Sequence, residues 1–418
     1  MKVSVIGLGY IGLPTATMFA SRELQVVGID VREHVVDTVN KGQIHIVEPE
    51  LAGLVRTAVD GGYLRASLEP EAADAFLIAV PTPFKGDHVP DVSYVKSAAE
   101  KVAPVLKRGD IVILESTSPV GTTEQMEGWL AALRPDLRFP SQVEGSDGMD
   151  VHIAYCPERV LPGYVVRELV ENDRIIGGMS PTCSARAIEV YRTFVKGELI
   201  VTDARTAEMC KLTENAYRDV NIGFANELSL ICDKLGINVW ELISLANHHP
   251  RVNILKPGCG VGGHCIAVDP WFIVDKSPDE ARLIRTAREV NDGKPGWVVD
   301  KIRERTAQLS AAGRSEADLT IALLGLAFKP DIDDLRESPA VRVAKSVRAS
   351  VKGKVLVVEP NIKSLPAGFD GMEQVALEQA MEQADVVVVL VAHSPFIAAR
   401  ADLSARPHVV DVTGALYG

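Results

Sequence analysis

The first 150 residues of the chain alternate short apolar runs with amphipathic segments. Apolar runs at residues 2–9, 25–30, 75–83 and 110–119 end in glycine, aspartate or proline. Residues 10–22, between the first two runs, follow a helical pattern. Regular alternation of strands and helices is typical of a doubly wound domain with a parallel sheet. We therefore predict an α/β domain at the N-terminus.

The pattern changes in the middle of the chain and then returns. Residues 203–245 are helical with little strand punctuation, and a second helical stretch reaches about residue 309. The apolar strand signature reappears at 319–328, 354–360 and 385–392. We expect an α/β fold with two Rossmann-like parallel-sheet domains joined by a helical central domain. The predicted domains are 1–201 for the dinucleotide, 202–298 for the helical part and 299–418 for a second ligand.

Composition narrows the functional class. With 418 residues the chain is too long for one ordinary core, and a net charge of −12 argues against nucleic-acid binding. No run approaches the roughly 20 apolar residues that span a bilayer, so no membrane partner is expected. The six cysteines have no spacing suited to a metal site, which favours free thiols in a reducing cytoplasm.

A glycine-rich turn follows the first predicted strand. The segment "GLGYIG" fits the G-x-G-x-x-G fingerprint, and Asp30 ends the second strand eighteen residues after the last glycine. Such glycines bring backbone N–H groups to a pyrophosphate, and the acid accepts hydrogen bonds from ribose hydroxyls. We predict NAD rather than NADP, with a flavin dinucleotide or a ligand-free turn as alternatives. The expected contacts in the turn are Gly7, Gly9, Tyr10, Ile11 and Gly12.

Two threonines lie at the ends of later strands, Thr82 in "AVPTP" and Thr117 in "ESTSP". Ligands of open α/β sheets bind beyond the carboxyl ends of strands, so both hydroxyls are candidates for the cofactor site. Helix capping is the alternative role for each, and it is the preferred role for Ser118.

The helical middle carries a polar face. Lys211, Asn215 and Arg218 are spaced at i, i+4 and i+7, which places them on one side of a helix. A solvated face is the plain alternative. The adjacent histidines His248 and His249 lack the further ligands that zinc needs, so we interpret them as structural or substrate contacts.

Cys265 stands in the unusual segment "GCGVGGHCIAVDP". Glycines let a backbone turn sharply and approach another molecule closely. A thiol in such a loop is either packed filler or a reagent, and Cys259 in the same segment is a second thiol to be excluded.

With these motifs together, the chain resembles the UDP-glucose/GDP-mannose dehydrogenase family over essentially its full length. The resemblance is carried, in order, by "GLGYIG", "ESTSPVGTT", "YCPERVLPG", "EMCKLTEN", "GVGGHCIAVDP" and "GLAFKPDIDDLRESPA". Val268 stands where the UDP-glucose branch has a lysine. The segments "GGHCIAVDPWF" and "HHPRVNILKPG" are most similar to the branch that acts on UDP-N-acetyl-D-mannosamine, with the UDP-N-acetylglucosamine branch as the alternative.

The resemblance implies a four-electron oxidation of a sugar C6 alcohol to a carboxylate, with two NAD reduced, in the synthesis of surface polysaccharides. It implies that Cys265 forms a thiohemiacetal and then a thioester. It makes Lys211 the acid–base residue and Asn215 a donor at the same oxygen. Glu158 is implied to handle the hydrolytic water, and Asp269 to support Lys211 or that water.

The resemblance also implies a UDP-sugar site and a homodimer built on the long middle helix. The implied substrate contacts are Arg159, Val160, Lys211, Asn215, Arg218, His249, Arg251, Gly262, Phe328, Lys329 and Arg336. The aspartates Asp331, Asp333 and Asp334 in the same motif are expected to form a charged surface loop.

Two other classes of protein share some of these features. A 3-hydroxyacid dehydrogenase combines a Rossmann domain with a helical domain and a Lys–Asn face, but it lacks the cysteine loop and the third domain. A dinucleotide-binding module without catalysis would leave Cys265 unexplained.

Overall fold

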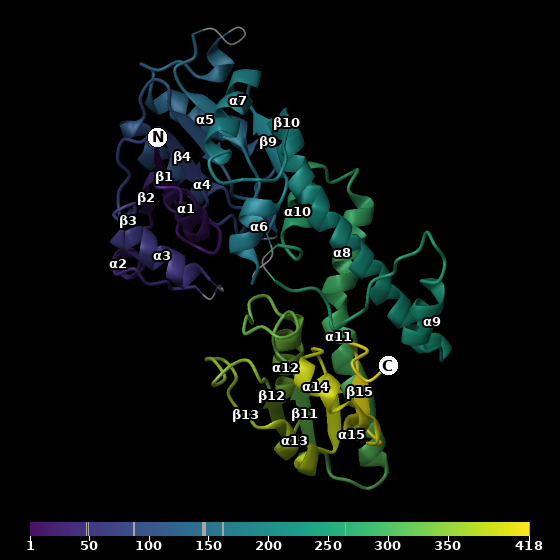
Figure 1. Cartoon of the computed structure of the whole chain (residues 1–418). Coiled ribbons are helices and arrows are strands. Elements are labelled where there is room, and N and C mark those ends of the chain that lie inside the picture. Colours follow the sequence, from purple (N-terminus) through teal and green to yellow (C-terminus); the bar gives the residue numbers. More distant parts are fainter. Residues whose placement is uncertain are drawn as a thin grey trace. The chain divides into compact units, whose positions relative to one another are not determined.

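The computed structural model describes residues 1–417 apart from 47, 49, 87, 144–147, 161–162 and 264. It divides the chain into two compact units (Figure 1). The first comprises 1–214 and 271–276, and the second comprises 215–270 and 277–418. No helix in the described part of the chain is long and apolar enough to cross a membrane.

The first unit is built on an eight-stranded sheet with the order β10-β9-β8-β7-β4-β1-β2-β3. Its neighbouring strands are parallel except for β8 and β9, which pair antiparallel. The strands are β1 (Lys2–Ile6), β2 (Gln25–Ile29), β3 (Leu64–Ser67), β4 (Ala75–Ile78), β7 (Ile111–Leu114), β8 (His152–Tyr155), β9 (Arg174–Gly178) and β10 (Leu199–Asp203). A separate antiparallel pair consists of β5 (Phe84–Lys85) and β6 (Val89–Pro90).

Helices cover both faces of this sheet. They are α1 (Gly12–Ala20), α2 (Glu33–Asn40), α3 (Leu51–Asp60), α4 (Ser93–Val102), α5 (Thr122–Leu133), α6 (Val165–Glu171) and α7 (Pro181–Tyr191), with 3-10 turns at Ala103–Val105 and Pro140–Gln142. Side chains of β4 alternate between two cores: Ala75 and Leu77 join one, and Phe76 and Ile78 join the other. A strand covered on both faces is apolar along its whole length, which explains the unbroken hydrophobic runs.

Long helices follow. α8 (Ala204–Leu235) is one uninterrupted helix of 32 residues, and the division between the units falls within it. It is followed by α9 (Val239–Ala246), α10 (Asp269–Lys276) and α11 (Arg282–Ala311). The predicted helical stretches are confirmed, and α11 continues past Pro295 without ending.

The second sheet has five parallel strands in the order β13-β12-β11-β14-β15. These are β11 (Thr320–Leu324), β12 (Lys354–Val358), β13 (Met372–Gln374), β14 (Val386–Val389) and β15 (Val409–Asp411). Its remaining elements are α12 (Pro339–Ser350), α13 (Leu377–Gln383), α14 (Ser394–Ala398), α15 (Arg400–Ser404) and a 3-10 turn at Glu316–Asp318. The prediction of two parallel-sheet domains joined by helices is confirmed.

Candidate functional site

The turn between β1 and α1 has the geometry of a dinucleotide-binding turn. Gly7 has a φ of +95°, and a Cβ on Gly12 would lie 1.7 Å from the Gly7 carbonyl oxygen, so both positions require glycine. A Cβ on Gly9 would meet nothing within 4 Å, which leaves open space beside the turn. α1 begins without a side-chain cap or an acidic residue in its first turn. The start of α1 at Gly12 is therefore suited to an anion such as a pyrophosphate, although Pro14 has no N–H and the Leu13 N–H donates to the Gly9 carbonyl oxygen.

Asp30 follows β2 and is buried. Its Oδ2 accepts the Leu8 N–H and Arg32 Nη2, each at 3.1 Å, and its Oδ1 accepts Arg32 Nε at 3.0 Å. Burial by itself would raise the pKa of Asp30, but the hydrogen bonds from Arg32 and Leu8 hold it below its usual value. The carboxylate is thus ionised at the position where a ribose acceptor is needed, and together with the turn it fits NAD.

Thr82 and Thr117 lie close together after β4 and β7. The Thr82 hydroxyl donates to the Thr117 carbonyl oxygen at 2.6 Å, which ties the two loops to each other. Ser118 does not cap α5, because its hydroxyl donates to the Ser116 carbonyl oxygen and the N-cap of α5 is Gly121. The capping role that the sequence favoured for Ser118 is therefore wrong.

Glu158 follows β8 and lies in a buried charge cluster. Its Oε2 is 2.8 Å from Arg174 Nη2, and its Oε1 accepts the Arg159 N–H at 2.7 Å. Arg174 also lies 3.6 Å from Glu115, which accepts the Tyr191 hydroxyl. Burial raises the pKa of Glu115 to about 7. Sequence reasoning missed Glu115 and Arg174, because only the pairing of β7, β8 and β9 brings them beside Glu158.

The other residues predicted around this segment have ordinary surroundings. Arg159 Nη2 forms an ion pair with Glu214 at 2.7 Å, and Val160 packs against the adjacent apolar core. Lys211 is half-buried on α8, one turn before Asn215.

Asn215 and Asp269 meet in the second unit. Asn215 Nδ2 donates to Asp269 Oδ2 at 2.5 Å, and both side chains are buried. Asp269 begins α10, and its N–H donates to the Cys265 carbonyl oxygen at 2.8 Å. The Asn215–Asp269 bond therefore connects α8 to the turn that carries the thiol. Arg218, one turn further along α8, is exposed.

The two cysteines of the glycine-rich loop differ sharply. Cys265 is exposed, whereas Cys259 is buried in the core of the C-terminal domain with its Sγ 3.5 Å from the Leu390 carbonyl oxygen. Burial raises the pKa of Cys259 to about 12. Of these two thiols, only Cys265 is accessible to a substrate.

The glycines of this loop serve a packing role. A Cβ on Gly262 would lie 2.6 Å from the Glu337 carbonyl oxygen, and a Cβ on Gly263 would lie 2.9 Å from the Phe328 ring. The loop that carries Cys265 thus packs directly on the segment "AFKPDIDDLRESP" through Gly262 and Gly263. The glycines of this segment predict a close approach to another molecule, and the close approach in the structure is to the protein's own chain.

Two aspartates of that segment, Asp331 and Asp334, make specific contacts, and Asp333 is exposed as predicted for a charged surface loop. Asp331 accepts the Ser394 N–H at 2.8 Å and the Ser394 hydroxyl at 2.6 Å at the start of α14. Arg336 donates to Asp334 through Nε and Nη2. Lys329 is exposed.

The remaining predicted substrate residues lie after α9. His249 and Arg251 are exposed, and the Arg251 N–H donates to His249 Nδ1 at 3.3 Å. Within the described residues, no group of three or more His, Cys, Asp or Glu side chains is arranged to hold a metal ion.

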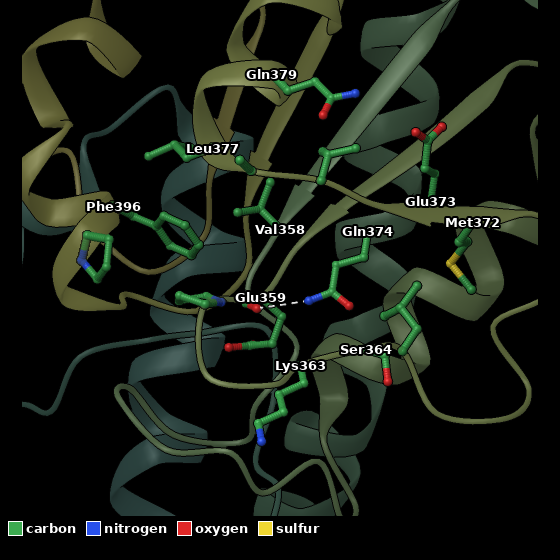
Figure 2. A pocket seen from close by; sticks show the side chains of 15 residues that line it. Val358, Glu359, Lys363, Ser364, Met372, Glu373, Gln374, Leu377, Gln379 and Phe396 are labelled. Atoms are coloured by element: carbon green, nitrogen blue, oxygen red, sulfur yellow. Dashed lines mark hydrogen bonds between the residues drawn. The ribbon is translucent and has the colours of Figure 1, made fainter.

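An open pocket of about 780 Å³ lies at the carboxyl ends of β12 and β13 and beside α14 (Figure 2). Glu359, Lys363, Gln374 and Phe396 are among its lining residues. None of the predicted substrate residues lines it.

Comparisons with known proteins cover the whole chain. Residues 1–195, 205–293 and 322–417 match the NAD-binding, central and UDP-binding domain models of the UDP-glucose/GDP-mannose dehydrogenase family. UDP-N-acetyl-D-mannosamine dehydrogenase of Salmonella typhi is 63% identical over 414 residues, which are 99% of this chain and 98% of the relative.

Two further relatives extend the comparison. NDP-N-acetyl-D-galactosaminuronic acid dehydrogenase of Ralstonia nicotianae is 62% identical over 412 residues, covering 99% of this chain and 95% of the relative. The solved structure of a UDP-N-acetyl-mannosamine dehydrogenase from S. aureus is 40% identical and has a TM-score of 0.87, covering 100% of this chain and 96% of the other.

Proposed function

We propose a function for this chain on the basis of its family, because the chain belongs to the UDP-glucose/GDP-mannose dehydrogenase family. The chain is an NAD-dependent nucleotide-sugar 6-dehydrogenase. It oxidises the C6 alcohol of UDP-N-acetyl-D-mannosamine to the carboxylate. The choice of sugar is supported by the 63% identical relative, which is named UDP-N-acetyl-D-mannosamine dehydrogenase. The observation that carries the chemistry is the exposed thiol of Cys265 beside the buried Asn215–Asp269 bond.

Cys265 provides covalent catalysis. Its thiolate adds to the C6 aldehyde, so that a C–S bond forms and the carbonyl oxygen takes up a proton to give a thiohemiacetal. Loss of a second hydride and a proton from this adduct leaves a thioester. Water then attacks the thioester carbonyl, the C–S bond breaks, and the thiolate of Cys265 is restored as the sugar acid leaves.

The polar residues handle protons and developing charge. Lys211 takes the C6 hydroxyl proton and stabilises the oxyanion, and Asn215 donates to the same oxygen. Asp269, by accepting the hydrogen bond from Asn215, orients that amide. Glu158, with one oxygen held by Arg174, acts on the hydrolytic water.

The glycine turn and Asp30 would hold NAD through its pyrophosphate and ribose. Thr82 and Thr117, joined after β4 and β7, belong to the same proposed site. When bound, NAD supplies the hydride acceptor for both oxidations, so each sugar acid accounts for two NADH.

The nucleotide sugar needs cations and backbone donors. We assign this role to the exposed groups of Arg218, His249, Arg251, Lys329 and Arg336 and to the half-buried ring of Phe328. Arg159, Val160 and the backbone at Gly262 complete the proposed contacts.

We place the enzyme in the cytoplasm. The surface of α8 fits a homodimer. Tyr217, Phe224 and Ile231 recur every seven residues along this helix, and all three are exposed, as is Leu235. A regular apolar stripe on a long helix is typical of an interface between helices. We assign the stripe to a second copy of the chain.

The test is turnover against a panel of UDP sugars with NAD or NADP, followed as NADH or NADPH formation with the acid quantified by chromatography. We expect the highest kcat/KM with UDP-N-acetylmannosamine and NAD. UDP-N-acetylgalactosamine belongs in the panel because the 62% identical Ralstonia relative has the corresponding sugar acid, N-acetyl-D-galactosaminuronic acid, in its name. Better turnover of that sugar, of UDP-N-acetylglucosamine or of UDP-glucose would refute the assigned sugar. Dinucleotide binding without turnover of any sugar would refute the assignment of this chain as an enzyme.

A further inference from the structure

The turn after β11 repeats the turn after β1. Gly325 has a φ of +92°, close to the +95° of Gly7. Glu359 follows β12 just as Asp30 follows β2. Its Oε2 accepts the Leu326 N–H at 2.6 Å, as Asp30 accepts a backbone N–H from the first turn. The second α/β domain therefore carries an acidic residue in the equivalent place, a glutamate where the first has an aspartate.

The surroundings of Glu359 exclude a role as a ligand acceptor. Its side chain is fully buried, and Oε2 accepts the N–H groups of Leu326 and Ala327 and lies 3.1 Å from His393 Nε2. Oε1 accepts the N–H and the side-chain amide of Asn361. Although burial alone would raise the pKa of Glu359, the bonds from His393, Leu326 and Asn361 hold it below its usual range. Five protein donors thus occupy this carboxylate.

His393 continues the chain of contacts. Its ring is fully buried, and Nδ1 faces two donors, the Asp331 N–H at 2.9 Å and the Asn361 amide at 3.1 Å. These partners assign Nδ1 as an acceptor and place the proton on Nε2, from which it is donated to Glu359. His393 therefore joins Glu359 to the backbone of Asp331.

The result is a segment held at both ends. Glu359 holds Leu326 and Ala327 at its start, and His393 and Ser394 hold Asp331 at its end. Asp331 has a φ of +59°, which the end of the segment must keep for both contacts. Phe328 and Lys329 lie between these two anchors.

The main chain of Glu359 is fixed from the neighbouring strand as well. Gln374, at the end of β13, donates through Nε2 to the Glu359 carbonyl oxygen at 3.2 Å and to the Ile362 carbonyl oxygen at 3.1 Å. Figure 2 shows the first of these bonds on one wall of the open pocket. The anchor is thus part of the sheet and does not depend on a ligand.

We propose that Glu359 and His393 are positioning residues for the nucleotide-sugar site, because they fix the segment 326–331 that carries Phe328 and Lys329. In the first domain the acid after the second strand pairs with Arg32, whose side chain is half-exposed, and in the second domain the acid pairs with the fully buried ring of His393. The inference rests on the proposed function, since Phe328 and Lys329 serve a substrate only if the chain binds a UDP sugar.

The test compares Glu359→Gln with Glu373→Gln. Both oxygens of Glu359 face only donors, so a glutamine amide at this position sets an N–H group against an N–H group in either orientation. Glu373 lies exposed on β13 and pairs with Lys354, so it receives the same substitution as a matched control. Asp331→Ala is the third variant. Asp331 is exposed, and this substitution removes the two bonds from Ser394, whereas the backbone N–H of residue 331 can still donate to His393 Nδ1.

Binding of UDP alone is measured by calorimetry, and KM for NAD, kcat and thermal unfolding are measured alongside. We expect the Kd for UDP to rise at least tenfold in Glu359→Gln and several-fold in Asp331→Ala. KM for NAD is expected to stay unchanged in both, and Glu373→Gln to match the wild type. If Glu359→Gln does not fold, the Kd for UDP of Asp331→Ala tests the positioning role instead.

Unchanged UDP affinity in a folded Glu359→Gln or Asp331→Ala variant overturns the positioning role. So does an equal loss of NAD and UDP affinity, which indicates general damage to the fold. Failure of the wild type to bind UDP refutes the proposed function instead, so the two failures are distinguishable.

Discussion

Replacing each cysteine of the glycine-rich loop by alanine separates the reactive thiol from the structural one. We expect Cys265→Ala to form no sugar acid, because an aldehyde without the thiol adduct cannot reach the thioester. Released NADH then falls from two per sugar acid in the wild type to at most one per sugar consumed. Cys259→Ala is expected to keep wild-type stoichiometry and most of its rate.

The magnitudes follow from the burial of Cys259. With a pKa of about 12, only about one molecule in ten thousand carries a Cys259 thiolate at pH 8, which is too few for a nucleophile. Its Sγ lies in the C-terminal core with Val298, Leu323 and Leu390. Removing it leaves a small void, so Cys259→Ala should lower the free energy of unfolding by about 1 kcal/mol. Cys265 is exposed, and its removal should leave stability nearly unchanged.

The assay follows NADH by absorbance and quantifies the acid by anion-exchange chromatography, with thermal unfolding of the same preparations. Trapping of the thioester by hydroxylamine in the wild type, and its absence in Cys265→Ala, completes the comparison. Normal acid production by Cys265→Ala, or its loss only in Cys259→Ala, would refute the assignment.

Four further outcomes are expected. Arg251→Ala should raise KM for the UDP sugar roughly tenfold or more, since a charge-assisted phosphate bond contributes about 1.5–3 kcal/mol; an unchanged KM removes Arg251 from the site. Asp30→Ala should narrow the preference for NAD over NADP, because it removes the ribose acceptor and releases Arg32 from its carboxylate; equal use of both cofactors by the wild type contradicts the role of Asp30. Burial lowers the pKa of Lys294 to about 7 from 10.5, so the unfolded chain binds the extra proton between these values and stability rises with pH across that window. Lys294→Met should flatten that rise in melting temperature, and equal slopes for both proteins would disprove the linkage. Phe224→Glu should shift sedimentation from dimer to monomer if α8 forms the interface, and a monomeric wild type would refute the dimer.

The charge cluster around Glu158 shows why the sequence could not identify all site residues. "PERV" marks Glu158, but Arg174 lies sixteen residues later, and Glu115 forty-three residues earlier, in segments without a motif. Only the pairing of β7, β8 and β9 places the three side chains together. The antiparallel turn of β9 against β8 is equally invisible in the apolar pattern, because strand direction leaves no trace in a buried run.

The sequence by itself determined the features that depend on neighbours along the chain. Glycine spacing defines the turn after β1, helical periodicity places Lys211 and Asn215 on one face, and apolar runs define both sheets. Tertiary structure alone decided which of two cysteines in one loop is buried, and that Glu359 belongs to His393 and not to a ligand. The physical reason is that turns and periodicities arise from local backbone geometry. Burial, and with it the pKa of a thiol or the partners of a carboxylate, depends on segments far away in the chain.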